Sequence, residues 1–338
     1  MSALDVRTAE WHAERQKGIG ASDVPAIAGV STFAQPIDVW QQKLGLVDQG
    51  EDSPMLRWGR LLEPVVAEEA EVVLGRKFRR LARAVRYRDW PILFAHLDRT
   101  SADAILEVKT SMTTKGWGES GTAEIPDAVA LQVQAQLACA DKETAYVAAL
   151  LGYRDFRWYE ITRDRPLFDD AILPLLREFW TLVETQTPPE PDGSDAYGQF
   201  IRRAYRVDDG TERVATPEEQ LIARQLAGVL ADKTAAEIRE EELRQRLMDA
   251  MGHTTKLEGP GWKVTWRKSK DTERTKWELV AKSYREAIER ELAMVDAGDM
   301  SETALPSRDD LDAIASLYTE TKIGPRPFLF KITEGTEE

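Results

Sequence analysis

The chain has 338 residues, which corresponds to roughly two domains of about 150 residues each. Its 45 Lys and Arg residues against 59 Asp and Glu residues give a formal net charge of −14. This charge excludes a surface that binds DNA non-specifically all over, but it leaves room for a locally basic channel. No apolar run reaches the roughly 18 residues of a membrane helix, and the N-terminus has no apolar secretory segment. We therefore expect a cytoplasmic protein that does not bind membranes.

The content of metal-binding side chains is low. Cys139 is the single cysteine, and the three histidines lie far apart in the chain. These counts exclude an internal disulfide, a Cys₄ zinc site and an all-cysteine iron–sulfur cluster. Any bound metal is therefore expected to be a hard cation held by carboxylates.

The N-terminal part of the chain is expected to be mainly helical. Residues 10–45 predict a helical segment followed by a glycine-punctuated turn, in which Ser22 and Asp23 suit a helix N-cap. Residues 54–75 repeat apolar side chains at intervals of three and four, which predicts a helix that stops at Gly75.

Strand patterns appear next. Residues 76–111 contain three short, partly alternating stretches separated by turn residues, which predict three strands. Helical spacing returns over 126–141, with Pro126 near the first turn. Residues 143–162 predict two strands around Gly152 to Asp155, and residues 166–186 predict another amphipathic helix.

The rest of the chain is expected to form an extension. Residues 187–198 are rich in Pro, Gly, Ser and Asp and mark a linker. Residues 217–252 predict one long charged helix, and the glycine–proline turn before Trp262 predicts a β-hairpin. A short helical region and an apolar terminal segment follow. The predicted organisation is a core over 1–186, a linker region over 187–216 and an extension over 217–338.

The most informative segment runs from His96 to Thr110. Asp98 ends one predicted strand, and Glu107 and Lys109 are two residues apart on the next. The strand period of two places Glu107 and Lys109 on one face, where Asp98 on a neighbouring strand can join them. Two carboxylates and an ammonium suit phosphodiester hydrolysis, since the acids hold Mg²⁺ and the lysine stabilises negative charge. The alternative is a Glu–Lys pair on a solvated strand.

Four stretches in order resemble the lambda-exonuclease-like, YqaJ-type viral recombinase family of PD-(D/E)xK nucleases. They are WHAERQKGIGASDV, WGRLLEP, the LD…EVK segment and LQVQAQLA, which together span residues 11 to about 165. The resemblance implies an α/β (α+β) restriction-endonuclease-like core, in which helices flank a mixed central sheet. Residues 190–338 extend beyond this core. The proline that often precedes the first catalytic acid of the family is Leu97 here.

The resemblance also implies roles for individual residues. Asp98, Glu107 and Lys109 match the catalytic set, and Val108 matches a metal ligand through its backbone carbonyl. Further matches are Glu63 as a carboxylate at the metal site, Gln134 as the glutamine facing the active site, and Gln132 as the weaker candidate for that glutamine. The alternatives are a solvated helix residue for Glu63 and an exposed helix face for the glutamine. The implied cofactor is Mg²⁺, with Mn²⁺ as an alternative.

Arg15 and Ser22 match a pair that lies near the 5′-phosphate of the DNA end in the family. An arginine and a hydroxyl at a helix N-terminus make a reasonable phosphate site. The alternatives are an N-cap role for Ser22 and an ion pair of Arg15 with Glu14 or Asp23.

The predicted hairpin carries a second candidate for DNA binding. Trp262 and Trp266 alternate with Lys263 and Arg267 in a short segment that also holds Lys268 and Lys270. Aromatic rings stack on bases and cations pair with phosphates, so the hairpin could grip DNA. The alternative is that both tryptophans pack on the long helix while the cations are solvated.

The resemblance implies a metal-dependent 5′-to-3′ exonuclease on double-stranded DNA that leaves 3′ single strands for phage-type recombination. It also implies a trimeric ring around DNA, a single-strand annealing partner and a bacterial host cell or prophage as the source. Two alternatives remain. One is a structure-specific endonuclease with the same core, and the other is an inactive module that binds DNA ends or a partner.

Overall fold

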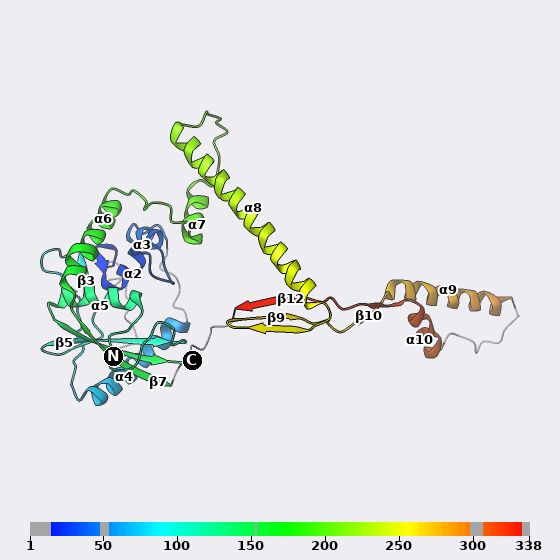
Figure 1. The fold of residues 1–338 in the computed structure, drawn as a ribbon, viewed down its shortest axis with the longest axis horizontal. Helices are drawn as coiled ribbons and strands as arrows, with labels where there is room; N and C mark the ends of the chain where they lie inside the picture. The colour runs from blue at the N-terminus through cyan, green and yellow to red at the C-terminus, as the bar shows by residue number, and fades with distance from the viewer. Residues whose placement is uncertain (1–14, 48–53, 153, 298–306, 333–338) are drawn as a thin grey trace. The chain divides into compact units, whose positions relative to one another are not determined.

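The computed structural model describes residues 15–47, 54–152, 154–297 and 307–332. The chain divides into two compact units, Met1–Thr211 and Glu212–Glu338 (Figure 1). No helix among the described residues has the length and hydropathy needed to cross a membrane.

A four-stranded mixed sheet forms the centre of the first unit. Its strands lie in the order β4 (Arg99–Thr100), β5 (Ala104–Ser111), β6 (Thr144–Leu151) and β7 (Asp155–Thr162). β5 runs parallel to β6, whereas β4 pairs with β5 and β7 pairs with β6 in the antiparallel direction. The mixed central sheet expected from the sequence is therefore confirmed.

Two helices cover the faces of this sheet. α4 (Pro54–Leu74) packs on one face and α5 (Asp127–Ala140), which connects β5 to β6, packs on the other (Figure 1). Strand alternation divides the side chains of β5 between them. Those on the α4 side are Ala104, Leu106 and Val108. Ile105 joins the larger core on the α5 side, and Glu107 shares its parity along the strand.

A smaller layer packs beside α5. β1 (Ile19–Gly20) is parallel to β3 (Leu93–Ala95), and β2 (Val85–Arg86) is antiparallel to β3. This layer includes η1 (Ala21–Asp23), α2 (Val24–Ile27) and α3 (Pro36–Lys43). The first of the three strands predicted over 76–111 is much shorter than expected. Apart from β2, its residues pair only through an isolated bridge at Arg79, because its arginines lie mostly at the surface and bind carboxylates of other elements.

The segment after the sheet is helical for longer than the sequence indicates. η2 (Leu167–Ile172), a π-helical turn, leads into α6 (Leu173–Glu184), as predicted for 166–186. The predicted linker region contains a further helix, α7 (Asp195–Ala204). Phe200 of α7 makes an edge-to-face contact with Trp40 of α3 at 5.7 Å. This packing explains why part of a Pro- and Gly-rich segment belongs to the first unit.

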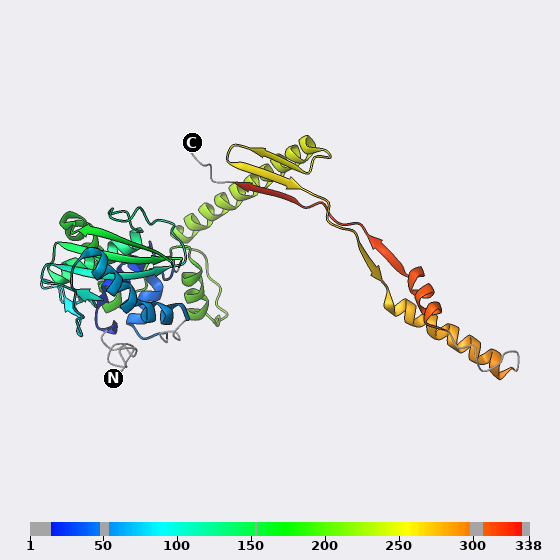
Figure 2. The same cartoon turned by 90° about the horizontal axis from the view of Figure 1, so that it is seen from below.

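The second unit begins with the predicted long helix, α8 (Pro217–Met251). A three-stranded antiparallel sheet follows, in the order β12 (Phe328–Ile332), β9 (Trp262–Trp266) and β8 (Lys256–Gly259). The predicted hairpin corresponds to β8 and β9. Within this unit, the two-stranded ribbon of β10 (Thr272–Thr275) and β11 (Thr319–Lys322) leads to α9 (Trp277–Asp296) and α10 (Arg308–Leu317) (Figure 2).

Candidate active site

Asp98, Glu107 and Lys109 meet at one edge of the central sheet. Glu107 and Lys109 lie on the same face of β5, and the Lys109 Nζ is 2.7 Å from Glu107 Oε1. Asp98 directly precedes β4, which pairs with β5 only as far as the Arg99–Leu106 partners. Past Leu106, the Asp98 carboxylate, and not a neighbouring strand, accepts a 2.8 Å hydrogen bond from the Val108 N–H.

Two glutamines of α5 hold the Glu107 carboxylate. Gln132 Nε2 donates to Glu107 Oε1 at 2.7 Å, and Gln136 Nε2 donates to Oε2 at 2.7 Å. Gln132 Oε1 also accepts from Lys109 Nζ at 2.9 Å, so it joins the acid and the ammonium. Residues four apart lie on one helix face, which explains why both glutamines reach Glu107. Gln136 was not among the residues singled out from the sequence, although its spacing from Gln132 is the signal that finds it.

The preference for Gln134 as the glutamine facing the site is wrong. Its Nε2 donates to the Thr162 carbonyl at 2.9 Å, and its Oε1 accepts from the Asp164 N–H at 2.8 Å. Gln134 is two residues from Gln132, so its side chain points to another side of α5. It ties α5 to the end of β7, while Gln132, the weaker candidate, faces Glu107.

Glu63 approaches the site from α4, but arginines hold its carboxylate. Glu63 Oε1 accepts from Arg99 Nη1 at 2.6 Å and from Arg80 Nη2 at 3.0 Å. The alternative of a solvated helix residue is therefore wrong, because Glu63 is only about a quarter exposed and is paired. Its negative charge still acts on Asp98, as the pKa of that residue indicates.

The electrostatics of the site raise the pKa values of both Asp98 and Lys109. Burial raises the pKa of Asp98 well above its ordinary value, and the charges of Glu107 and Glu63 raise it further. The Val108 N–H and the charge of Lys109 oppose this rise only in part. Burial alone would lower the pKa of Lys109, but the charges of Glu107 and Asp98 raise it above its ordinary value.

Arg15 and Ser22 come together at the N-terminal layer. Arg15 Nη1 donates to Ser22 Oγ at 3.3 Å, and Arg15 also pairs with Asp23. Asp23 is buried, and its Oδ2 accepts from the Gly20 N–H at 3.0 Å and from Lys43 Nζ at 2.6 Å. The expected N-cap role of Ser22 is not observed, because its hydroxyl accepts from Arg15 and η1 has no side-chain cap. The other expected ion-pair partner, Glu14, lies outside the described residues.

Comparisons with known proteins identify similar families and structures. Residues 10–143 match the model of the YqaJ-like viral recombinase domain. This chain is similar to that domain over these residues. It is 35% identical over 213 residues to the uncharacterized protein YqaJ of Bacillus subtilis (strain 168), a match that covers 61% of this chain and 66% of that protein. The coverage of that relative is thus just under two thirds of its length.

Two solved structures are similar at lower levels. An alkaline exonuclease, LHK-Exo, from Laribacter hongkongensis is 15% identical with a TM-score of 0.41, and the match covers 60% of this chain and all of that one. A phage-related exonuclease from Haemophilus somnus 129PT is 12% identical with a TM-score of 0.37, over 55% of this chain and 96% of that one. Both TM-scores are below 0.5, so these likenesses establish neither a shared fold nor an activity.

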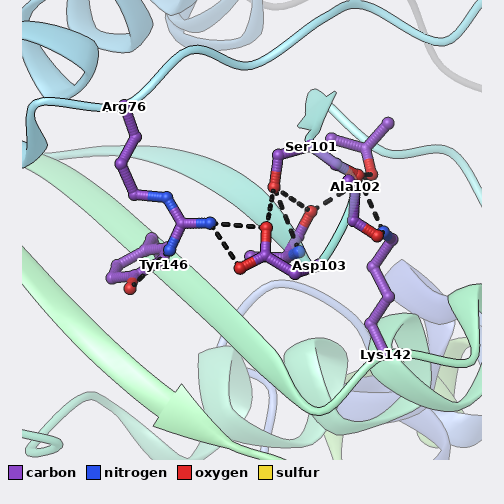
Figure 3. Close-up of polar contacts among 8 residues, drawn as sticks. Arg76, Ser101, Ala102, Asp103, Lys142 and Tyr146 are labelled. Carbon is purple, nitrogen blue, oxygen red and sulfur yellow. Dashed lines mark hydrogen bonds and ion pairs between the residues drawn. The ribbon is translucent and has the colours of Figure 1, made fainter.

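A polar cluster supports the turn that joins β4 to β5 in the first unit. Arg76 binds both carboxylate oxygens of Asp103, at 2.5 and 2.6 Å, and donates to the Tyr146 hydroxyl at 3.0 Å. Lys142 donates to the Ser101 and Ala102 carbonyls at 2.8 Å each (Figure 3). The turn is thereby fixed to β6 and to the end of α5. Because Asp98 directly precedes β4 and Glu107 lies on β5, the cluster helps to hold the two acids in register.

The donor set of the site fits a small hard cation. Within the described part of the chain, no three or more His, Cys, Asp or Glu side chains group closely enough to hold a metal by themselves. Mg²⁺ needs only one or two protein carboxylates, since water and substrate phosphates complete its shell. Asp98 and Glu107 supply two, and the pKa of Asp98 is raised first by burial and then by the charge of Glu107, which a cation between them would offset.

The candidate DNA-binding residues of the hairpin lie outside residues 10–143. Along β9, the aromatic and the cationic side chains alternate between the two faces of the sheet. Trp262 stacks on Phe330 of β12 with ring centroids 6.4 Å apart. The Trp266 ring lies under the Arg326 guanidinium at 3.8 Å, and its Nε1 donates to the Arg326 carbonyl at 2.6 Å. Both tryptophans therefore contact β12 and the segment that leads to it. Strand alternation places Lys263 on the opposite face of β9 from the two tryptophans.

The three glutamines of α5 allow a matched test. Gln132→Ala is expected to lower phosphodiester cleavage about 10- to 100-fold, because it frees both Lys109 and Glu107 from their common partner. Gln134→Ala is expected to leave cleavage unchanged but to lower the free energy of unfolding by about 1–3 kcal/mol, because two partly buried hydrogen bonds to the backbone are lost. Single-turnover cleavage rates and urea unfolding curves of both variants check this. Equal effects of the two substitutions on cleavage would contradict it.

Proposed function

We propose that this chain is a divalent-metal-dependent exonuclease that degrades the 5′-ended strand of double-stranded DNA and leaves a 3′ single strand for phage-type homologous recombination. One observation carries the proposal. Within the residues that match the YqaJ-like domain, Asp98 and Glu107 converge with Lys109 at a sheet edge, and Lys109 lies 2.7 Å from Glu107. Two acids and one ammonium in this arrangement match the needs of phosphodiester hydrolysis.

Each residue has a separate task in this proposal. Asp98, Glu107 and the Val108 carbonyl would hold Mg²⁺ or Mn²⁺, with Glu63 as a further carboxylate nearby. The bound cation would supply Lewis-acid polarisation of the phosphate and activation of water. Lys109 has a raised pKa, so it is protonated at neutral pH and stabilises developing negative charge instead of acting as a base.

Glutamines orient these groups. Gln132 holds the Lys109 ammonium and Glu107 in one geometry, and Gln136 fixes the second oxygen of Glu107. A carboxylate held at both oxygens cannot rotate away from its partner, which keeps the reacting groups in place before substrate binds. These two residues are positioning residues in the proposed reaction.

The 5′ polarity is supported by Arg15 and Ser22. Their guanidinium and hydroxyl groups are 3.3 Å apart, and a terminal phosphate can accept hydrogen bonds from both. A pocket for a terminal phosphate has a use only at a DNA end, which favours an exonuclease over an endonuclease. A trimeric ring and a single-strand annealing partner belong to the proposal through the family resemblance alone.

The experiment compares three DNA substrates of one sequence in Mg²⁺. They are a linear duplex with 5′-phosphate ends, the same duplex with 5′-hydroxyl ends, and a covalently closed circle. We expect progressive loss of the 5′-ended strands, faster for the phosphorylated duplex by about tenfold or more, since the phosphate contacts are charge-assisted. The circle is expected to stay intact, and chelation of the metal is expected to stop all cleavage.

The other outcomes discriminate between functions. Cutting of the circle would replace the exonuclease with an endonuclease that uses the same core. No cleavage of any substrate, with DNA binding retained, would favour a module that binds DNA ends or a partner. Equal rates for phosphate and hydroxyl ends would remove Arg15 and Ser22 from end recognition and leave the nuclease itself in place.

A further inference from the structure

One face of the three-stranded sheet in the second unit gathers cations around a hollow. The hollow has a volume of about 320 Å³, and it is lined by Lys256, Lys263, Thr265, Arg267, Pro327 and Leu329. The opposite face carries the apolar side chains, among them fully buried Val264. The sheet therefore has one packed face and one face that presents positive charge, which is called the cationic face below.

The cationic face holds an unfavourable pairing of like charges. Lys331 of β12 lies directly opposite Lys263 of β9 in the antiparallel register. Like charges opposite each other in a sheet are destabilising. Among the described residues, neither lysine forms an ion pair, whereas Lys256 at the rim pairs with Glu258. On the other neighbouring strand, Glu258 of β8 lies opposite Lys263. An anionic ligand between Lys263 and Lys331 would relieve their repulsion.

The positively charged side chains of the cationic face are spaced so that they suit a row of anionic groups better than a single anion. Lys263 and Arg267 are four residues apart, and Lys331 and Lys256 extend the positive charge onto both neighbouring strands. Strand geometry spreads these groups by about 5 Å between strands and about 7 Å between alternate residues. The Thr265 hydroxyl and the apolar Leu329 lie between them, which matches a sugar–phosphate backbone with its alternating polar and apolar parts.

We propose that the cationic face binds the sugar–phosphate backbone of DNA without reading its sequence. The inference rests on the proposed function only in taking DNA as the substrate, since backbone binding requires no cleavage. It differs from the expectation of base stacking by the hairpin, because Trp262 and Trp266 take no part. In a chain of net charge −14, such a local cationic surface gives the DNA a place to bind that the overall charge does not.

The test measures binding of the full-length chain to a fluorescent duplex with 5′-hydroxyl ends in the presence of EDTA, so that no cleavage occurs. The variant is Lys263→Gln/Lys331→Gln. The matched control is Lys233→Gln/Lys282→Gln, which removes the same charge from exposed helix positions of the same unit. We expect the variant to bind about tenfold more weakly, and the slope of log affinity against log salt to fall by about 2. The control is expected to bind as the parent does.

Stability separates binding from folding. Because Lys263→Gln/Lys331→Gln removes a repulsion, we expect its melting temperature to equal or exceed that of the parent while its DNA affinity falls. Equal affinities of variant and control would overturn the inference. The inference would also be overturned if the variant lost binding to a polyglutamate peptide but bound DNA as tightly as the parent. That result would assign the face to an acidic protein. A failed nuclease assay leaves this binding test intact, and a failed binding test leaves the nuclease proposal intact.

Discussion

Asp98→Asn and Lys109→Ala variants are each expected to cleave linear duplex DNA at least about 10³-fold more slowly than the unaltered chain. Asp98→Asn keeps an oxygen that can accept from the Val108 N–H but removes the charge that a cation needs. Lys109→Ala removes the ammonium that lies 2.7 Å from Glu107. The measurement is the single-turnover rate on a 5′-phosphorylated linear duplex in saturating Mg²⁺.

Folding controls make this result interpretable. Asp98→Asn is expected not to lower the melting temperature, because it relieves the repulsion of Asp98 by Glu107 and Glu63. Activity and stability would then respond in opposite directions, as at sites where function is maintained against stability. Lys77→Ala, at a side chain that is 87% exposed, serves as the control for loss of a lysine. Cleavage by Lys109→Ala at the rate of the parent would move the chemistry away from this sheet edge.

Asp23→Asn is expected to lower the free energy of unfolding by about 3–5 kcal/mol, because it leaves a buried ammonium without its anion. Asp23 is 4% exposed, and the side chain of its partner Lys43 is 2% exposed. Among the described residues, the other acceptor of the Lys43 Nζ is the Arg15 carbonyl at 2.8 Å, which carries no full charge. Urea unfolding at neutral pH measures this loss.

A double variant provides the control for Asp23. Asp23→Asn/Lys43→Met removes both buried charges and is expected to recover most of the lost stability, because an apolar side chain replaces the unpaired ammonium. If the double variant is as unstable as Asp23→Asn alone, the loss comes from the Gly20 contact instead of from the ion pair. Cleavage assays on 5′-phosphate ends show whether the pair also positions Arg15.

The pH dependence of the Asp23 effect has a defined sign. Burial alone would raise the pKa of Asp23, but Lys43 and Arg15 bring it below its ordinary value of 3.8. The ionised carboxylate therefore stabilises the fold above about pH 4, and this contribution is lost as the pH falls through the folded-state pKa. The stability difference between the parent and Asp23→Asn should shrink in acid. A difference that stays constant down to pH values below the folded-state pKa would contradict the pairing.

Local periodicity predicted several parts of the candidate site correctly. The period of two along β5 predicted that Glu107 and Lys109 share a face, and the structure places their charged groups 2.7 Å apart. Spacings of three and four predicted the helices over 54–75 and 126–141, which appear as Pro54–Leu74 and Asp127–Ala140. Periodicity succeeds here because one face of each element is buried, and the apolar residues record that face.

The same periodicity did not identify which glutamine faces the site. Gln132, Gln134 and Gln136 alternate with Val133 and Ala135 on a helix that is buried on more than one side. Such a helix has no polar face to show its rotation. The preference for Gln134 was therefore wrong, and only the packing of α5 against β5 and the end of β7 distinguishes the three.

The sequence by itself determined most of the helices and strands of this protein and the shared face of Glu107 and Lys109, because each depends on residues close together in the chain. The mixed sheet followed only from the resemblance to the YqaJ-type family. Tertiary structure alone decided the partners. The Asp98 carboxylate binds the Val108 amide because β4 ends before it, and Lys43 reaches Asp23 across 20 residues because both are buried in the same layer. These contacts arise from where elements pack, and a pattern within one element contains no information about its neighbour.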